Sequence, residues 1–177
     1  MRLMSRKAVV RSAAVIMAAV FVSWLSGVRV FAFAGDSMAP AVKAGDRFVG
    51  LVGWWGSRDY RRFEMVIFDL PEHSPWAQRR IPWMKRLVGL PGEHVELRGS
   101  QLWIDGRELD APFLRLDDEQ PAPRKDHDLV LGADEFFVVG DNLDHTSDDS
   151  RSFGPLKRSH LKGAVAIVLP AASKKKK

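Results

Sequence analysis

Residues 12–28 form an uncharged and largely apolar run near the N-terminus, SAAVIMAAVFVSWLSGV. In lipid such a run satisfies its backbone hydrogen bonds as a helix, and its 17 residues lie at the short end of the range that spans a bilayer. The excess of basic residues before the run predicts a cytoplasmic N-terminus over residues 1–11, an anchor over residues 12–30 and a body on the trans side. The flanking basic residues are Arg2, Arg6, Lys7 and Arg11 before the run and Arg29 after it.

A cleaved secretory signal would begin in a similar way, and Ala32-Phe33-Ala34 has the small-x-small pattern of a cleavage site. Two observations favour an uncleaved anchor. Arg29 interrupts the stretch before that site, and the apolar core is longer than the about 7–15 residues usual for a signal. We therefore expect the body to remain attached to the membrane.

The body of the chain carries a slight negative charge, although the formal charge of the whole chain is +5. Four basic residues precede the apolar run and four form the tail Lys174–Lys177, and removing these eight takes the formal charge from +5 to −3. A body of that charge does not favour nucleic-acid binding, and residues 171–177 are expected to be a solvated basic tail. The lack of cysteine excludes disulfides, thiolate catalysis and cysteine-ligated metal sites.

After the apolar run, short strand-like segments alternate with turn residues. No long segment there has a helical period, and Asp105-Gly106 is a typical hairpin turn. We predict a mostly β body over residues 31–170, a coiled antiparallel sheet or partly open barrel, with a loop or reduced insertion at about 105–130. The strand-like segments are residues 47–52, 64–70, 83–88, 94–97, 101–104, 136–139 and 163–169.

Ser37 and Lys85 are candidates for a nucleophile and its base. A serine hydroxyl attacks a carbonyl efficiently when a base takes its proton. Lysine can be that base if it is neutral, and burial among apolar side chains lowers its pKa from about 10.4 by disfavouring the ammonium form. Trp83, Met84 and Leu87 supply such neighbours in sequence. The two residues therefore suggest a serine–lysine protease next to a bilayer.

Three motifs occur in order behind the apolar run: GDSMAP at 35–40, KRLVGLPG at 85–92, and GDN at 140–142 with SDDSRSFG at 147–154. Together they resemble the type I signal peptidases, the membrane-anchored proteases that cut signal peptides from exported preproteins. The segment Glu64–Phe68 also resembles a strand of that family. The resemblance covers most of residues 35–169.

This resemblance implies that Ser37 is the nucleophile and Lys85 the general base of an acyl-enzyme mechanism without a cofactor, on a mostly β fold shared with the self-cleaving repressors of the DNA-damage response. It makes Ser147 the hydroxyl that orients Lys85, with Thr146 as the competitor because the segment is one residue longer than in some relatives. Ion pairs that brace the family's site match Arg86, Asp141, Asp149 and Arg151.

Two departures from the family pattern matter for the site. Gly35 stands where some relatives carry a serine or threonine as a second oxyanion donor, so the oxyanion would depend on the Ser37 backbone N–H and the Gly35 region. The insertion after Lys85 is short, which implies that the accessory domain of larger relatives is reduced or absent.

The resemblance also implies a place and a substrate. We expect a monomer that crosses the bacterial inner (cytoplasmic) membrane once, with its catalytic domain on the periplasmic or extracellular side. Its substrates would be preproteins cut after Ala-x-Ala.

Other interpretations remain open at this point. His145 near Asp144 and Asp148 allows a Ser37–His145–Asp triad, and the same acidic loop allows a metal site if its carboxylates converge. The protease could be dedicated to one pilin-like or conjugation substrate. In a different class, the chain could be an exported β domain that binds a partner without chemistry.

Overall fold

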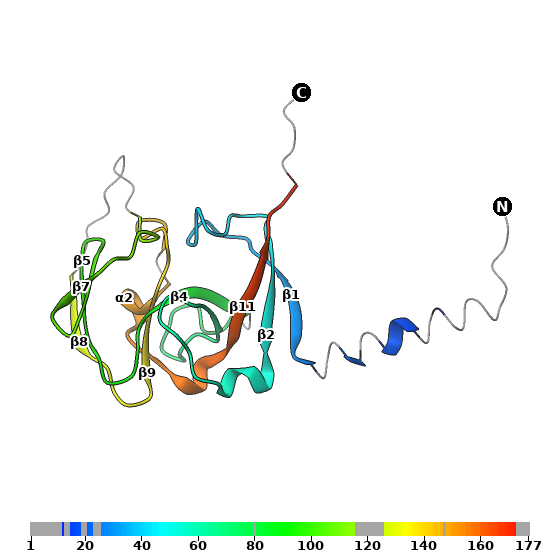
Figure 1. Cartoon of the computed structure of the whole chain (residues 1–177), viewed down its shortest axis with the longest axis horizontal. Helices are drawn as coiled ribbons and strands as arrows, with labels where there is room; N and C mark the ends of the chain where they lie inside the picture. The colour runs from blue at the N-terminus through cyan, green and yellow to red at the C-terminus, as the bar shows by residue number, and fades with distance from the viewer. Residues whose placement is uncertain are drawn as a thin grey trace, which may run out of the picture.

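The computed structural model describes residues 12, 15–18, 21–22, 26–79, 81–115, 126–146 and 148–172. Within them, eleven strands form two antiparallel sheets (Figure 1). The larger sheet has the order β1-β2-β11-β3-β4-β9-β10. Its strands are β1 (Val28–Ala32), β2 (Arg47–Val52), β3 (Met65–Phe68), β4 (Trp83–Gly89), β9 (Glu135–Val139), β10 (Leu156–Lys157) and β11 (Leu161–Leu169).

The smaller sheet has the order β7-β6-β5-β8 and lies at the opposite end of the molecule from β1 and β2 (Figure 1). Asp105 and Gly106, with φ angles of 50° and 73°, turn β6 into β7, which confirms the predicted hairpin. Positive φ at both central residues is what a type I′ turn requires. The strands are β5 (His94–Arg98), β6 (Gln101–Ile104), β7 (Arg107–Leu109) and β8 (His127–Val130).

Three apolar clusters hold the strands together. One lies among β3, β4, β9 and the short helix α2 (Ser150–Phe153), and includes Phe68, Leu87 and Phe136. A second joins β4 and β9 to the smaller sheet, and includes Val88 and Phe137. The third packs the segment after β1 against β2, β3 and β4. Two single-turn 3₁₀ helices complete the fold, η1 (Gly53–Ser57) and η2 (Arg158–His160).

The prediction of a mostly β body is confirmed, and its strand-like segments coincide with β2, β3, β4, β5, β6, β9 and β11. Four strands were not expected. β1 begins at Val28, inside the range 12–30 assigned to the anchor, because it pairs with β2 from Val28↔Leu51 to Ala32↔Arg47. β7 and β8 occupy the two ends of the expected insertion, and β10 is two residues long.

Of the predicted anchor, residues 13–14, 19–20 and 23–25 lie outside the described residues. Among those that are described, no helix is long and apolar enough to cross a membrane.

Candidate active site

Ser37 lies in a tight turn that follows β1. The backbone N–H of Ala39 donates to the Asp36 carbonyl at 3.0 Å, and that of Val42 donates to the Met38 carbonyl at 2.8 Å. Met38 and Val42 are fully buried in the third apolar cluster. Because Met38 and Val42 fix the turn in the core, Ser37 is half-buried at the surface, and its hydroxyl can contact a side chain of β4.

Lys85 reaches Ser37 from the middle of β4. β4 pairs with β3 at Val66↔Lys85, and the two-residue period of a strand places Lys85 on the same face as Trp83 and Leu87. The Lys85 side chain is 3% exposed, and its Nζ lies 2.8 Å from Ser37 Oγ. The structure therefore brings together the two residues that the sequence separates by 48 positions.

Burial changes the protonation of Lys85. Loss of hydration lowers its pKa to about 8, against the opposing attraction of the Asp149, Asp148 and Asp141 carboxylates. A lysine with that pKa has an appreciable neutral fraction at neutral to mildly alkaline pH, so its Nζ can accept a proton from a hydroxyl at hydrogen-bond distance.

Arg86, the next residue of β4, holds the loop that follows β9. Its Nε and Nη2 donate to the two carboxylate oxygens of Asp141 at 2.7 and 2.5 Å, and Asp141 is fully buried. Burial raises the pKa of Asp141, whereas the Arg86 guanidinium opposes that rise. Arg86 also donates to the Phe63 carbonyl at 2.8 Å and lies 4.4 Å from the centre of the Phe113 ring. The guanidinium is therefore enclosed on all these sides, and its position is fixed.

Asp149 and Arg151 form the second ion pair beneath the site. Arg151 donates to both carboxylate oxygens of Asp149, and its Nη2 also donates to the carbonyls of Leu143 and Thr146 at 2.9 and 3.0 Å. Asp149 in turn accepts from the Gly140 N–H at 3.1 Å and caps α2 through the Arg151 N–H. This pair therefore closes the loop 140–149 at both ends.

That loop contacts the backbone of the serine itself. The Asn142 N–H donates to the Ser37 carbonyl at 3.1 Å, and Thr146 Oγ1 lies 3.3 Å from the same oxygen and 2.7 Å from the Asn142 carbonyl. A Cβ on Gly140 would lie 2.1 Å from Thr146 Oγ1 and 2.6 Å from the Ser37 carbonyl oxygen, so glycine is required there. Thr146 thus positions the backbone of Ser37. Ser147, predicted to orient Lys85, lies outside the described residues.

A groove of about 470 Å³ leads away from Ser37 and Lys85. One wall is the extended segment Phe31–Gly35, the other is Ile81–Met84, and Phe48 contributes to the lining. Two backbone hydrogen bonds hold the first wall in an extended conformation. The Phe33 N–H donates to the Asp46 carbonyl, and the Phe33 carbonyl accepts from the Gly45 N–H, both at 2.8 Å. The groove is mainly apolar, and it ends at the Ser37 and Lys85 side chains.

The segment after β7 supports the site in a way that the sequence did not indicate. The Arg115 N–H donates to the Asp141 carbonyl at 2.7 Å, and the Leu143 N–H donates to the Arg115 carbonyl at 2.9 Å. Phe113 covers Arg86 and packs edge to face with Phe63, with ring centres 4.9 Å apart. These residues lie in the region expected to be an insertion, and no motif marks them.

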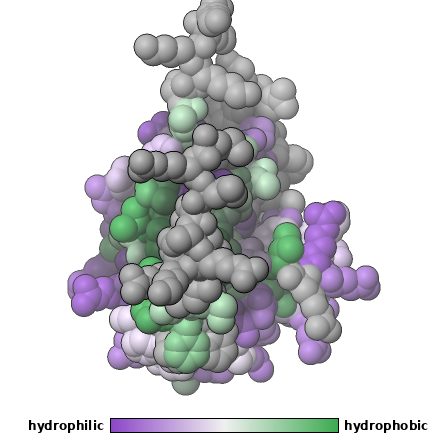
Figure 2. Space-filling model, turned by 90° about the vertical axis from the view of Figure 1, so that its right-hand side faces the viewer, coloured by the Kyte–Doolittle hydropathy of each residue, from purple (hydrophilic) through white to green (hydrophobic). Residues whose placement is uncertain are grey.

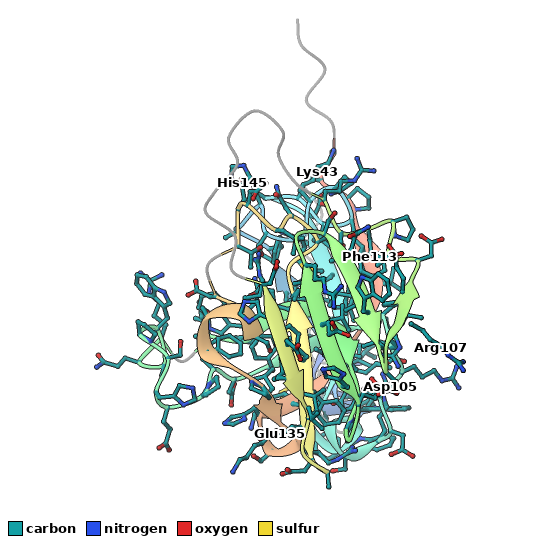
Figure 3. All side chains as sticks on the ribbon, turned by 90° about the vertical axis from the view of Figure 1, so that its left-hand side faces the viewer. Lys43, Asp105, Arg107, Phe113, Glu135 and His145 are labelled. Atoms are coloured by element: carbon teal, nitrogen blue, oxygen red, sulfur yellow. The ribbon has the colours of Figure 1, made fainter. Side chains whose placement is uncertain are left out.

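The alternative sites receive no geometric support. His145 is exposed (Figure 3), and among the described residues Ser37 Oγ accepts a hydrogen bond from Lys85 Nζ. Within the described ranges, no three His, Asp, Glu or Cys side chains converge as the ligands of a metal ion would.

Comparison with known proteins identifies relatives over most of the chain. The family described as signal peptidase, peptidase S26, matches residues 6–169. Signal peptidase I V of Bacillus subtilis strain 168 is 31% identical over 144 residues, which cover 75% of this chain and 80% of that protein. Signal peptidase IB of Staphylococcus aureus strain COL is 26% identical over 152 residues, 75% of this chain and 73% of that protein.

A solved structure is also similar. The crystal structure of a signal peptidase I from Enterococcus faecalis V583 superimposes with a TM-score of 0.50 at 28% identity. The similarity covers 62% of this chain and 98% of that one.

Proposed function

The chain belongs to the signal peptidase family, peptidase S26, and removes signal peptides as a serine endopeptidase; from this premise we propose that Ser37 is its nucleophile and Lys85 its general base. The observation that carries the proposal is the 2.8 Å contact between Lys85 Nζ and Ser37 Oγ, made by a lysine whose pKa burial lowers to about 8.

In the proposed reaction, neutral Lys85 takes the hydroxyl proton as Ser37 Oγ attacks the carbonyl of the scissile bond. The protonated lysine then gives that proton to the leaving amine, and the acyl group stays on Ser37. Lys85, neutral again, takes a proton from a water that attacks the ester, and it returns this proton to Ser37 Oγ as the acyl group leaves as the acid. The Ser37 N–H and the Gly35 region would stabilise the oxyanion. The resemblance makes Ser147 the residue that orients Lys85, and this stays a prediction.

We also propose that the chain cuts after small residues at the first and third positions before the scissile bond, with Ala-x-Ala favoured. Alternate side chains of an extended peptide point the same way, so these two positions would face the same side of the groove beside Ser37. A peptide library with all residues at both positions measures the preference. Equal cleavage of large and small residues at the first position would refute it.

For its location, we propose a single-pass anchor, with the body on the trans side of the membrane. Three paired strands support contact with lipid, because Val30, Val49 and Ile167 lie side by side on the outer face of β1, β2 and β11, and Val30 and Ile167 are 61% and 56% exposed. Figure 2 shows hydrophobic surface on this side of the molecule. Protease added to intact spheroplasts should digest the body, and digestion only after lysis would contradict this orientation.

The Ser37→Ala, Lys85→Ala and Lys85→Arg variants test the proposed dyad. Each should abolish cleavage of a preprotein in detergent, and the double variant Ser37→Ala/Lys85→Ala should be no worse than either single one, because the two residues act as one unit. Arginine stays protonated and cannot act as the base. Circular dichroism and thermal unfolding would establish that the variants fold. Normal turnover by a folded Lys85→Ala protein would end the proposal.

A further inference from the structure

Arg79 is a second cation in the groove that ends at Ser37. Of the described residues that line this groove, most are apolar, and the charged ones are Lys85 and Arg79. Lys85 is 3% exposed and serves the dyad. Arg79 is exposed and lies six positions earlier in the chain, on the loop between β3 and β4.

The two groove walls show which end Arg79 occupies. Both the segment from Phe31 to Ser37 and the segment from Ile81 to Lys85 run toward the dyad, so their first residues lie at the far end. A strand rises about 3.3 Å per residue, which places Trp83, where β4 begins, roughly 7 Å before Lys85, and Ile81 and Arg79 precede it in the groove lining. The substrate residues before the scissile bond occupy this same groove under the proposed function. Arg79 therefore faces the part of the substrate about four to six residues before that bond.

The Arg79 side chain is stacked on its own loop and forms no ion pair with any described residue. Its guanidinium stacks on Trp76, 4.6 Å from the ring centre, and the backbone N–H of Arg79 donates to the Trp76 carbonyl at 2.9 Å. The same loop is tied to α2, because His73 Nε2 lies 2.7 Å from the Phe153 carbonyl oxygen. No carboxylate among the described residues lies within ion-pair distance of Arg79. Stacking leaves the edge of a guanidinium free to donate.

We propose that Arg79 is a specificity-determining residue that selects an acidic side chain four to six residues before the scissile bond. A guanidinium edge matches the two oxygens of a carboxylate, and a guanidinium already stacked on Trp76 loses little freedom on binding it. Since Arg79 is exposed, the preference is modest, about two- to fivefold in kcat/KM. It decreases with salt, because exposed charges are screened.

The test uses Ala-x-Ala peptides that carry Glu, Gln or Lys at the fourth, fifth or sixth position before the bond, assayed in neutral detergent. Unmodified protein should cleave one Glu peptide two- to fivefold faster than its Gln partner. Arg79→Gln should remove this ratio and Arg79→Glu should reverse it in favour of Lys. Arg107→Gln, an exposed arginine of β7, is the matched control and should leave the ratio unchanged.

The inference rests on the proposed function, so binding of the same peptides to the Ser37→Ala protein is measured as well. The Gln-to-Glu ratio in Kd should match the Glu-to-Gln ratio in kcat/KM, and this binding ratio can be measured without turnover. Equal binding and cleavage of the three peptides at every position would overturn the role of Arg79. A Glu-to-Gln ratio that is unchanged in the Arg79→Gln protein would also overturn it. The same holds if Arg79→Gln lowers cleavage only on anionic vesicles and equally for all peptides, because Arg79 would then bind lipid headgroups.

Discussion

The charged site beside β4 and the His94–Asp128 pair of the smaller sheet have opposite surroundings. Beside β4, the Lys85 ammonium and the Asp141 and Asp149 carboxylates are 3% exposed or less. On the smaller sheet, His94 and Asp128 form an ion pair whose side chains are 37% and 72% exposed. Burial changes the pKa of a group and makes its partner indispensable, whereas water screens the exposed pair. The chemistry of this chain therefore depends more on which of its charged groups are buried than on the number of its charged groups.

The Arg86→Ala variant should give the largest change in stability. It leaves the Asp141 carboxylate buried without its partner, which costs about 3–5 kcal/mol in the free energy of unfolding. Urea unfolding measures this. Arg107→Ala, which removes an exposed arginine of β7 (Figure 3), should stay within about 0.5 kcal/mol of the unmodified protein. Equal losses for both variants would show that burial does not distinguish the two regions.

Replacement of Lys85 by methionine should stabilise the fold while it abolishes cleavage. The pKa of Lys85 is lower in the folded protein, about 8, than its ordinary 10.5, so the unfolded chain binds the proton more tightly. The lowered pKa therefore destabilises the folded state below pH 8, and this destabilisation decreases as pH rises toward 10.5. Lys85→Met should therefore gain up to roughly 3 kcal/mol at pH 7 and about half of that at pH 9.5. A Lys85→Met protein that is less stable at pH 7 would contradict the penalty.

The rate of cleavage should report the same lysine. Below pH 8, kcat/KM should fall about tenfold for each pH unit, because only neutral Lys85 accepts the Ser37 proton. Stopped assays with one peptide across pH 5.5–9.5 measure this rise of kcat/KM with pH. A rate that stays flat down to pH 6 would exclude a lysine of this pKa as the base.

The exposed pair of the smaller sheet should give the smallest effect. The hydrogen bond with Asp128 raises the pKa of His94 above 6.5, so its contribution to stability is present below pH 6.5 and is lost as pH rises through the raised value. Asp128→Asn should lower the melting temperature slightly at pH 5.5 and leave it unchanged at pH 8. Cleavage should not change at either pH. A loss at pH 8 equal to that at pH 5.5 would mean that the charge of His94 is not involved.

Much of the fold could be predicted from local pattern. β2 and β6 were located to the residue, because each is a short apolar run bounded by turn residues. β1, β7 and β8 were not found. β1 continues an apolar run whose composition is typical of a membrane-spanning segment. β7 and β8 are short, polar edge strands, and their extended conformation comes from pairing with β6 and β5 and not from an alternating sequence pattern.

For the site, the residue types and their order can be seen in the sequence: a serine in a turn, a lysine in an apolar strand, and the arginines and carboxylates that the family resemblance assigns to ion pairs. Tertiary structure decided the rest. Pairing of β4 with β3 and the packing of Met38 bring Nζ to Oγ, and burial then lowers the pKa of Lys85. The contacts of Phe113 with Arg86, of Thr146 with the Ser37 carbonyl, and of Arg79 with the groove join segments distant in the chain. No local pattern encodes such contacts, because proximity and loss of water arise when the sheets close around the site.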